Sequence, residues 1–243
     1  MAGHSKWAKL KHFKGAIDAK RARIFAKLSR EVAIAAKLGG GDPDMNPRLR
    51  MVLLKCRSAN MPSDNIERAI KKGTGGGEAT AYEELTYEVF GPHGVAMLVE
   101  LSTDNRNRTA AEIRSILTRN GGTMATTGAV SRLFHRRGQI IIPREAAGED
   151  QLMELALEVG AEDFKAEAEG YEILTEPARL EAVHRELEAR NIKCASAEIT
   201  YLPTVTAPVA DPGSAGAVNR LLDALEEHDD VKEVHTNAEF PAQ

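Results

Sequence analysis

The spacing of apolar residues changes near residue 80 of this 243-residue chain, and this change constrains the fold more than any other feature. Before that point, apolar residues recur every three or four positions, as on one face of an α-helix. After it, segments that alternate between apolar and polar residues, typical of half-buried strands, appear between helical segments. The sequence therefore predicts an α+β protein with a helical N-terminal part.

Three helices are expected in that N-terminal part. The first ends at the three glycines 39–41, and Asn46-Pro47 starts the second by pairing an N-cap residue with a proline at the first helical position. The third starts near Pro62 and ends at Gly73, where glycine-rich residues 73–77 form an expected linker. The apolar stripe of the first helix consists of Ile17, Ile24, Phe25, Leu28 and Val32.

The alternating pattern predicts a β-hairpin over residues 85–101, with its turn at 91–94. A helix is expected from about Arg106 to Arg119, followed by a strand at 129–134. From residue 139 to 201 the order is strand, helix, strand, strand, helix, strand, which is the order of a ferredoxin-like domain. A last helix and a short strand close the chain.

The first ββαβ group lacks the helix and strand that would complete it, and the C-terminal helix and strand could supply them. We therefore expect three domains. They are a basic helical domain with an N-terminal arm (1–78), a discontinuous α/β domain (79–136 plus 205–243) and an inserted ferredoxin-like βαββαβ domain (137–204).

Charge is also divided along the chain. Residues 1–75 hold 17 Lys and Arg against 6 Asp and Glu, whereas the rest holds 15 against 30. Because salt screens charges beyond about 8 Å, the basic end keeps its own local field. This asymmetry indicates a polyanion such as nucleic acid as the partner of the helical domain, rather than two evenly solvated surfaces. The acidic α/β part would suit a basic protein partner.

The N-terminal arm and the first helix are the main candidate site, because Lys and Arg can neutralise phosphates. Trp7 and Phe13 lie between the lysines of the arm. They could stack on unpaired bases, or Trp7 could pack against the helical domain, and both interpretations stay open. The candidate nucleic-acid-binding residues are Lys6, Trp7, Lys9, Lys11, Lys14, Lys20, Arg21, Arg23, Lys27 and Arg30.

A second candidate site is the polar segment 103–109, between an expected strand and an expected helix. Thr103, Asp104 or Asn105 can cap that helix. Capping does not explain two arginines at a helix start, where cations oppose the dipole. The segment therefore either only caps the helix or also binds a phosphate or an acidic partner through Asp104, Asn105, Arg106, Asn107 and Arg108.

No segment matches a Walker A loop, a nucleophile elbow or a zinc-protease helix. The seven histidines are scattered, and Cys56 and Cys194 lie far apart. We therefore expect no catalytic residue, no metal site and no cofactor. No apolar run approaches the roughly 18 residues of a membrane span, and no secretory signal is recognisable, so we expect a cytoplasmic protein with reduced thiols that does not bind a membrane.

Four segments together resemble the YebC/PmpR family: residues 1–7 (MAGHSKW), 39–43 (GGGDP), 60–66 (NMPSDNI) and 103–109 (TDNRNRT). The resemblance implies three domains, the third inserted into the second, with no enzymatic activity. Members are described as DNA-binding transcriptional regulators of the cytoplasm. Others, including a mitochondrial branch, are described as translation factors that act on the ribosome at difficult stretches such as proline runs. The implied partner is therefore DNA, or ribosomal RNA in the alternative.

Overall fold

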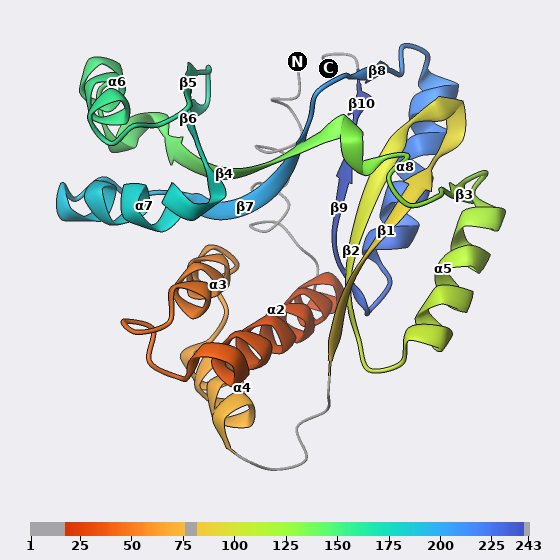
Figure 1. Cartoon of the computed structure of the whole chain (residues 1–243), viewed down its shortest axis with the longest axis horizontal. Helices are drawn as coiled ribbons and strands as arrows, with labels where there is room; N and C mark the ends of the chain where they lie inside the picture. Colours follow the sequence, from red (N-terminus) through yellow and green to blue (C-terminus); the bar gives the residue numbers. More distant parts are fainter. Residues whose placement is uncertain (1–17, 76–81, 241–243) are drawn as a thin grey trace. The chain divides into compact units, whose positions relative to one another are not determined.

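The computed structural model of the chain describes residues 18–75 and 82–240 (Figure 1). The described residues divide into two compact units. One unit contains residues 82–135 and 201–240, and the other contains residues 18–75 and 136–200.

The N-terminal part of the second unit is a bundle of three helices, which we call the helical domain: α2 (Asp18–Gly39), α3 (Pro47–Ser58) and α4 (Ser63–Thr74). The predicted cap of the second helix is confirmed, because Asn46 Oδ1 accepts a hydrogen bond from the Leu49 N–H at 3.1 Å. The predicted stripe is also confirmed where it is described: Leu28 and Val32 are buried, and Ile24 and Phe25 pack beside them. Ile17 lies outside the described residues.

A glycine permits close packing between α2 and α4. A Cβ atom at Gly73 would lie 2.3 Å from the backbone oxygen of Ala33, a separation that no side chain can occupy. With this face of α4 against α2, the preceding Lys71 and Lys72 are exposed on the outside of the bundle.

The second half of this unit confirms the predicted βαββαβ order. Its elements are β4 (Phe134–Pro143), α6 (Glu149–Glu158), β5 (Asp163–Ala166), β6 (Gly170–Thr175), α7 (Leu180–Ala189) and β7 (Ser196–Pro203). The strands lie in the order β5-β6-β4-β7, and β6 is antiparallel to both β5 and β4. Ile140, Ile142 and Ile173 of the sheet share a core with residues of α6 and α7, to which α3 adds Met51 and Leu54.

The first unit is built on a sheet of four strands in the order β3-β1-β2-β9. Its elements are β1 (Glu83–Phe90), β2 (Ala96–Thr103), α5 (Arg106–Arg119), β3 (Thr123–Met124), α8 (Pro212–Glu226) and β9 (Val231–Thr236). Because β9 pairs with β2, the C-terminal helix and strand do complete the sheet begun by the hairpin. Val99, Ile113 and Leu221 belong to the core that the sheet shares with α5 and α8. A second, two-stranded sheet joins β8 (Ala207–Pro208) to β10 (Ala238–Glu239).

The predicted strand at 129–134 is wrong. Residues 126–133 form turns that end in a short 3-10 helix, Ser131–Leu133, and the next strand begins only at Phe134. The reason is Glu88 on β1, whose carboxylate accepts hydrogen bonds from the backbone N–H groups of Gly128 (2.6 Å), Val130 (2.6 Å) and Ser131 (2.9 Å). The donors that a strand would offer to a neighbouring strand bind this carboxylate instead.

Replacing Glu88 by Gln is expected to lower the free energy of unfolding by about 2 kcal/mol, because the amide NH₂ cannot accept the hydrogen bonds that a carboxylate oxygen accepts. Burial raises the pKa of Glu88, but the backbone donors outweigh it and hold the pKa below its usual value. The carboxylate therefore stabilises the fold above its unfolded-state pKa, and this contribution is lost as pH falls through the lower folded-state pKa.

Urea unfolding at neutral and acidic pH checks this prediction. Glu83→Gln on the same strand is the control, since Glu83 is exposed and lies 3.8 Å from Arg106, and such exposed pairs contribute little. Equal unfolding midpoints for Glu88→Gln and Glu83→Gln would show that the carboxylate does not stabilise the loop.

Candidate nucleic-acid interface

The helical domain is the cationic part of the chain. Residues 18–75 carry 13 Lys and Arg against 6 Asp and Glu. Residues 137–204 carry 7 against 15, and residues 79–136 together with 205–243 carry 8 against 14. A polyanion would therefore be attracted to the helical domain and repelled by the remainder.

The candidate residues of the N-terminal arm, Lys6, Trp7, Lys9, Lys11 and Lys14, lie outside the described residues. The other five lie on α2 and differ in accessibility. Lys20 and Arg21 are exposed, whereas Arg23, Lys27 and Arg30 are half-buried and none of these three is without an interaction partner. Lys20 and Arg21 are therefore the cations of this set that a phosphate can reach most readily.

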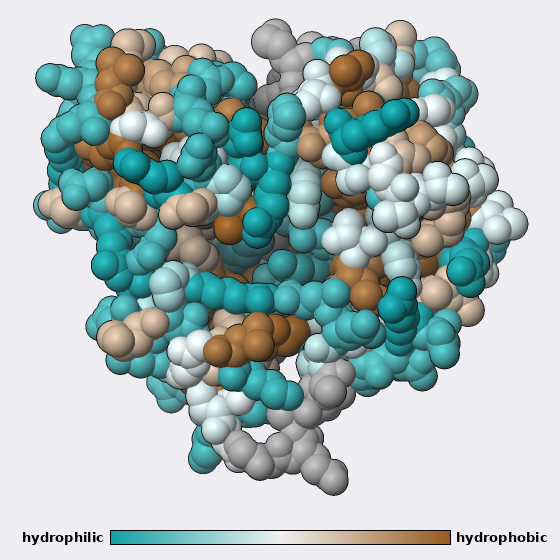
Figure 2. Space-filling view, viewed as in Figure 1, coloured by the Kyte–Doolittle hydropathy of each residue, from teal (hydrophilic) through white to brown (hydrophobic). Residues whose placement is uncertain are grey.

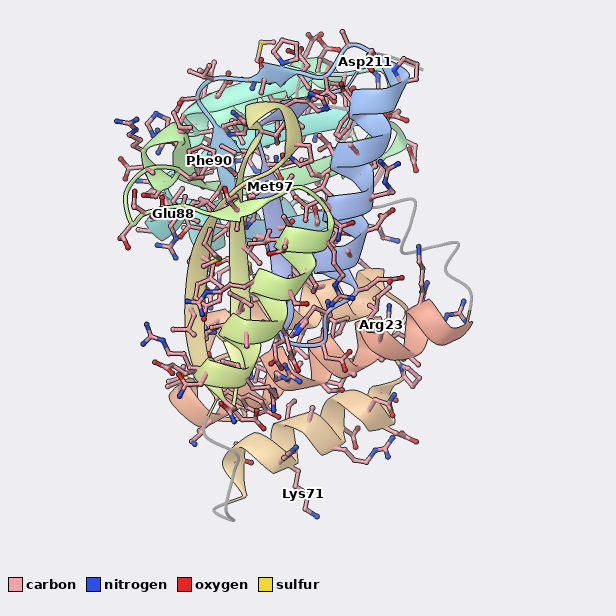
Figure 3. The ribbon with its side chains drawn as sticks, turned by 90° about the vertical axis from the view of Figure 1, so that its right-hand side faces the viewer. Arg23, Lys71, Glu88, Phe90, Met97 and Asp211 are labelled. Atoms are coloured by element: carbon pink, nitrogen blue, oxygen red, sulfur yellow. The ribbon has the colours of Figure 1, made fainter. Side chains whose placement is uncertain are left out.

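Sequence reasoning missed several exposed cations on α3, on α4 and next to the loop between α2 and α3. In α4, apolar positions 66, 69 and 70 face the core, so the helical period alone would have placed the cations 68, 71 and 72 outside. Lys71 extends from α4 away from the bundle (Figure 3). The exposed cations missed are Lys37, Arg48, Arg57, Arg68, Lys71 and Lys72.

Two further cations of α3 are used inside the unit. Arg50 pairs with Glu181 at 2.7 Å and Lys55 pairs with Glu198 at 2.6 Å, both on the ferredoxin-like part. Ser58 Oγ donates to the backbone oxygen of Ala195 on the same side of α3. The cationic surface of the helical domain therefore does not include the face of α3 that carries Arg50, Lys55 and Ser58.

The segment 103–109 caps α5. Asn105 is the N-cap residue, and its side chain accepts a hydrogen bond from the Arg108 N–H at 3.1 Å. The Arg108 guanidinium donates to Asp104 (2.9 Å) and to Asp230 (2.8 Å). Thr109 Oγ1 also donates to Asp230, at 2.6 Å.

Arg108 is therefore held by carboxylates of its own domain, which offsets the unfavourable position of a cation at a helix start. Arg106 is the more accessible arginine, with 63% of its side chain exposed and Glu83 3.8 Å away. Asn107 is exposed as well. Of the five candidate residues here, Arg106 and Asn107 are the two that could meet a partner without breaking this network.

The fold brings together histidines and acids that are far apart in sequence. His228 Nε2 lies 2.9 Å from Glu112, and its Nδ1 accepts the Asp230 N–H at 3.1 Å. His235 Nε2 lies 3.0 Å from Glu100, with Glu233 close by. Both ring nitrogens of His228 already have protein partners. Hydrogen bonds therefore explain why Glu112, His228 and Asp230 lie together, and no metal ion is needed to explain it.

The two thiols are poor nucleophiles. Burial raises the pKa of Cys56 and of Cys194 to about 12, so neither is ionised near neutral pH.

Comparison with known proteins gives the chain its family. Residues 5–76 match the TACO1/YebC protein N-terminal domain, and residues 82–238 match the TACO1/YebC second and third domain. The chain belongs to the TACO1/YebC family. The resemblance seen in the sequence is confirmed, and so is the predicted α+β class, with N-terminal helices followed by sheets.

Relatives in the TACO1/YebC family share about half of their residues with this chain. A "Probable transcriptional regulatory protein" of Opitutus terrae is 50% identical over 240 residues, covering 99% of this chain and 97% of its own. One of Halothermothrix orenii, with the same name, is 51% identical over 243 residues, covering 99% and 96%. The crystal structure of a conserved hypothetical protein from Aquifex aeolicus, 45% identical, covers 94% of both chains with a TM-score of 0.83. The family is thus one of regulatory proteins by name.

No helix within residues 18–75 and 82–240 has both the length and the apolar character needed to cross a lipid bilayer.

Proposed function

We propose that this TACO1/YebC-family chain is a non-enzymatic regulator of gene expression that binds duplex DNA through its helical domain and N-terminal arm. The observation that carries the proposal is the confinement of excess positive charge to the helical domain, where exposed cations are found on α2, α3 and α4. The names of the relatives point the same way, since they are called probable transcriptional regulatory proteins.

In this proposal, exposed cations of the helical domain neutralise DNA phosphates and release their counterions, which makes binding strongly salt-dependent. Lys20 and Arg21 contribute from α2, and Lys71 and Lys72 from α4, together with the lysines of the arm. The other two domains, over 79–136 plus 205–243 and over 137–204, have an acidic excess and stay off the DNA. Arg106 and Asn107 are the exception in these domains, and they form a second contact with a phosphate or an acidic partner.

The second candidate function is that of a ribosome-associated, RNA-binding translation factor that relieves stalled synthesis. One sequence feature favours it: Trp7 and Phe13 lie between the lysines of the arm, as expected of side chains that stack on unpaired bases. Duplex DNA offers no unpaired base, so stacking by Trp7 and Phe13 would contribute less if the chain binds duplex DNA.

Sedimentation of cell lysate in a sucrose gradient tests the choice between the two. The DNA-binding proposal predicts that the protein stays at the top of the gradient and that specific promoter fragments are recovered with it. Co-sedimentation with ribosomes at moderate salt, without promoter recovery, would contradict it and support the translation factor.

A further inference from the structure

The corner between α2 and α3, residues Leu38–Asn46, exposes two large apolar side chains. Leu38 is 69% exposed and Met45 is 79% exposed, and within the described helical domain no other large apolar residue is exposed to this degree. Figure 1 shows the corner projecting from its bundle between the two helices. We call these nine residues the α2–α3 corner.

The backbone segments that carry the two apolar residues are held together. Asn46 Nδ2 donates to the backbone oxygens of Ala35 (2.8 Å) and Gly40 (2.7 Å), which draws residues 45–46 against the end of α2. A Cβ atom at Gly39 would lie 2.7 Å from the Asn46 side chain. Leu38 precedes Gly39 and Met45 precedes Asn46, so the backbone positions of the two exposed residues flank this close contact.

The backbone of the corner is also fixed from within. Asp42 Oδ1 accepts the Asp44 N–H at 2.9 Å, and the Asp42 backbone oxygen accepts the Met45 N–H at 3.2 Å. The corner is therefore ordered before any partner binds, and binding does not incur the entropic cost of ordering it.

A single exposed apolar residue needs no explanation, and Figure 2 shows brown apolar groups scattered among hydrophilic side chains. This pair differs in its surroundings. Lys37 precedes Leu38 and the exposed Arg48 follows shortly after Met45, in a domain with an excess of positive charge. Apolar side chains flanked by cations are the arrangement with which proteins insert Leu or Met between bases while Lys and Arg hold the adjacent phosphates.

The two acidic residues of the corner, Asp42 and Asp44, are better suited to contact bases than to contact phosphates. Asp44 lies 4.0 Å from the Arg50 guanidinium and remains exposed, so it would repel a phosphate that approached the corner directly. A carboxylate can accept a hydrogen bond from a base amino group.

We propose that Leu38 and Met45 act as a wedge that inserts between stacked bases of the nucleic acid, with Lys37 and Arg48 on the flanking phosphates. The proposal rests on the proposed nucleic-acid binding and adds the residues that reach the bases. A protein partner with an apolar patch is the alternative occupant of the corner.

The test uses the full chain and a DNA duplex with 2-aminopurine at its TA steps, which unstack most easily. 2-Aminopurine becomes brighter when it is unstacked. Wild-type protein is expected to raise the fluorescence on binding. Leu38→Ser/Met45→Ser is expected to abolish the rise and to weaken binding about tenfold, with an unchanged slope of affinity against salt, because apolar stacking contacts release no ions.

The matched control is Met153→Ser/Leu157→Ser on α6, which removes two exposed apolar side chains of the same types from the acidic inserted domain. It is expected to bind like wild type, and both double variants should melt near the wild-type temperature because the changed side chains are exposed. Binding by wild type without a rise in fluorescence, or equal affinity of the corner variant and wild type, overturns the wedge. Failure of wild type to bind any DNA duplex would instead overturn the proposed function.

Discussion

Changing Lys20, Arg21, Lys71 and Lys72 together to Gln is expected to weaken duplex DNA binding about a thousandfold at 0.1 M salt. Each phosphate contact contributes about −0.9 to the slope of log affinity against log salt, so the slope should become shallower by about 3.6. The difference between variant and wild type should disappear towards 1 M salt, where ion release no longer favours binding. Fluorescence anisotropy of labelled duplex across a salt series measures both quantities.

A second quadruple variant controls for the change in net charge. It removes the same number of cations from the inserted domain. Lys165, Arg185 and Arg190 have 50%, 55% and 39% of their side chains exposed there, and Lys193 is exposed. Changing these four to Gln alters net charge by the same amount but should leave the salt slope unchanged. If both quadruple variants lost affinity equally, binding would depend on net charge and not on the helical domain.

Asp230→Ala is expected to lower the free energy of unfolding by about 2–4 kcal/mol. Asp230 lies just before β9, its side chain is only 7% exposed, and it accepts hydrogen bonds from Thr109 at 2.6 Å and Arg108 at 2.8 Å. Removing the carboxylate takes away the acceptor that the buried Thr109 hydroxyl and Arg108 share, and leaves Arg108 with Asp104. It also removes the hydrogen bonds that join the start of β9 to the start of α5. These two elements belong to the two separate sequence segments of the discontinuous domain.

The pH dependence of stability tests the same network. Burial raises the pKa of Asp230, but the hydrogen bonds from Thr109 and Arg108 outweigh it, so the pKa lies below its usual value. The carboxylate therefore stabilises the fold above its unfolded-state pKa, and the stabilisation disappears as pH falls through the folded-state pKa. Asp230→Asn, which keeps the volume, should lose stability at neutral pH and depend less on pH below 4. Asp223→Ala, at an exposed position of α8, should match wild type. A loss from Asp223→Ala as large as that from Asp230→Ala would contradict the account.

The elements that the sequence predicted correctly are those fixed by local chemistry. The side chain of Asn46 caps the helix that Pro47 begins, and Asn105 caps α5, because an N-cap bonds only to residues two or three positions ahead. The βαββαβ order was predictable for a similar reason, since each of its helices and strands shows its own apolar period.

The features that were missed depend on partners distant in sequence. Residues 129–134 look like a strand, but Glu88, about 40 residues earlier, accepts the backbone N–H groups of Val130 and Ser131. Arg108 looks like a free cation at a helix start until Asp230 is placed beside it. The apolar period cannot show such pairings, nor strands of two residues such as β3, where too few positions alternate.

The accessibility of the candidate cations was only partly predictable. The polar face of α2 was identified from the period, but a period does not show that Arg23, Lys27 and Arg30 are half-buried while Lys20 and Arg21 are exposed. The α2–α3 corner was recognisable as a helix stop from its glycines. The apolar period does not show that Leu38 and Met45 are both exposed on this corner. The backbone there is held by the hydrogen bonds that Asn46 makes to the end of α2.

Lysine footprinting of the full chain tests most directly whether the helical domain is the nucleic-acid-binding surface. An amine-reactive reagent is applied with and without duplex DNA, and modification of each lysine is measured by mass spectrometry. The account predicts that DNA protects Lys20, Lys37, Lys71 and Lys72, while Lys165, Lys193 and Lys232 react equally in both samples. Protection confined to Lys165, Lys193 or Lys232, or no protection of any lysine at a DNA concentration that saturates binding, would contradict it.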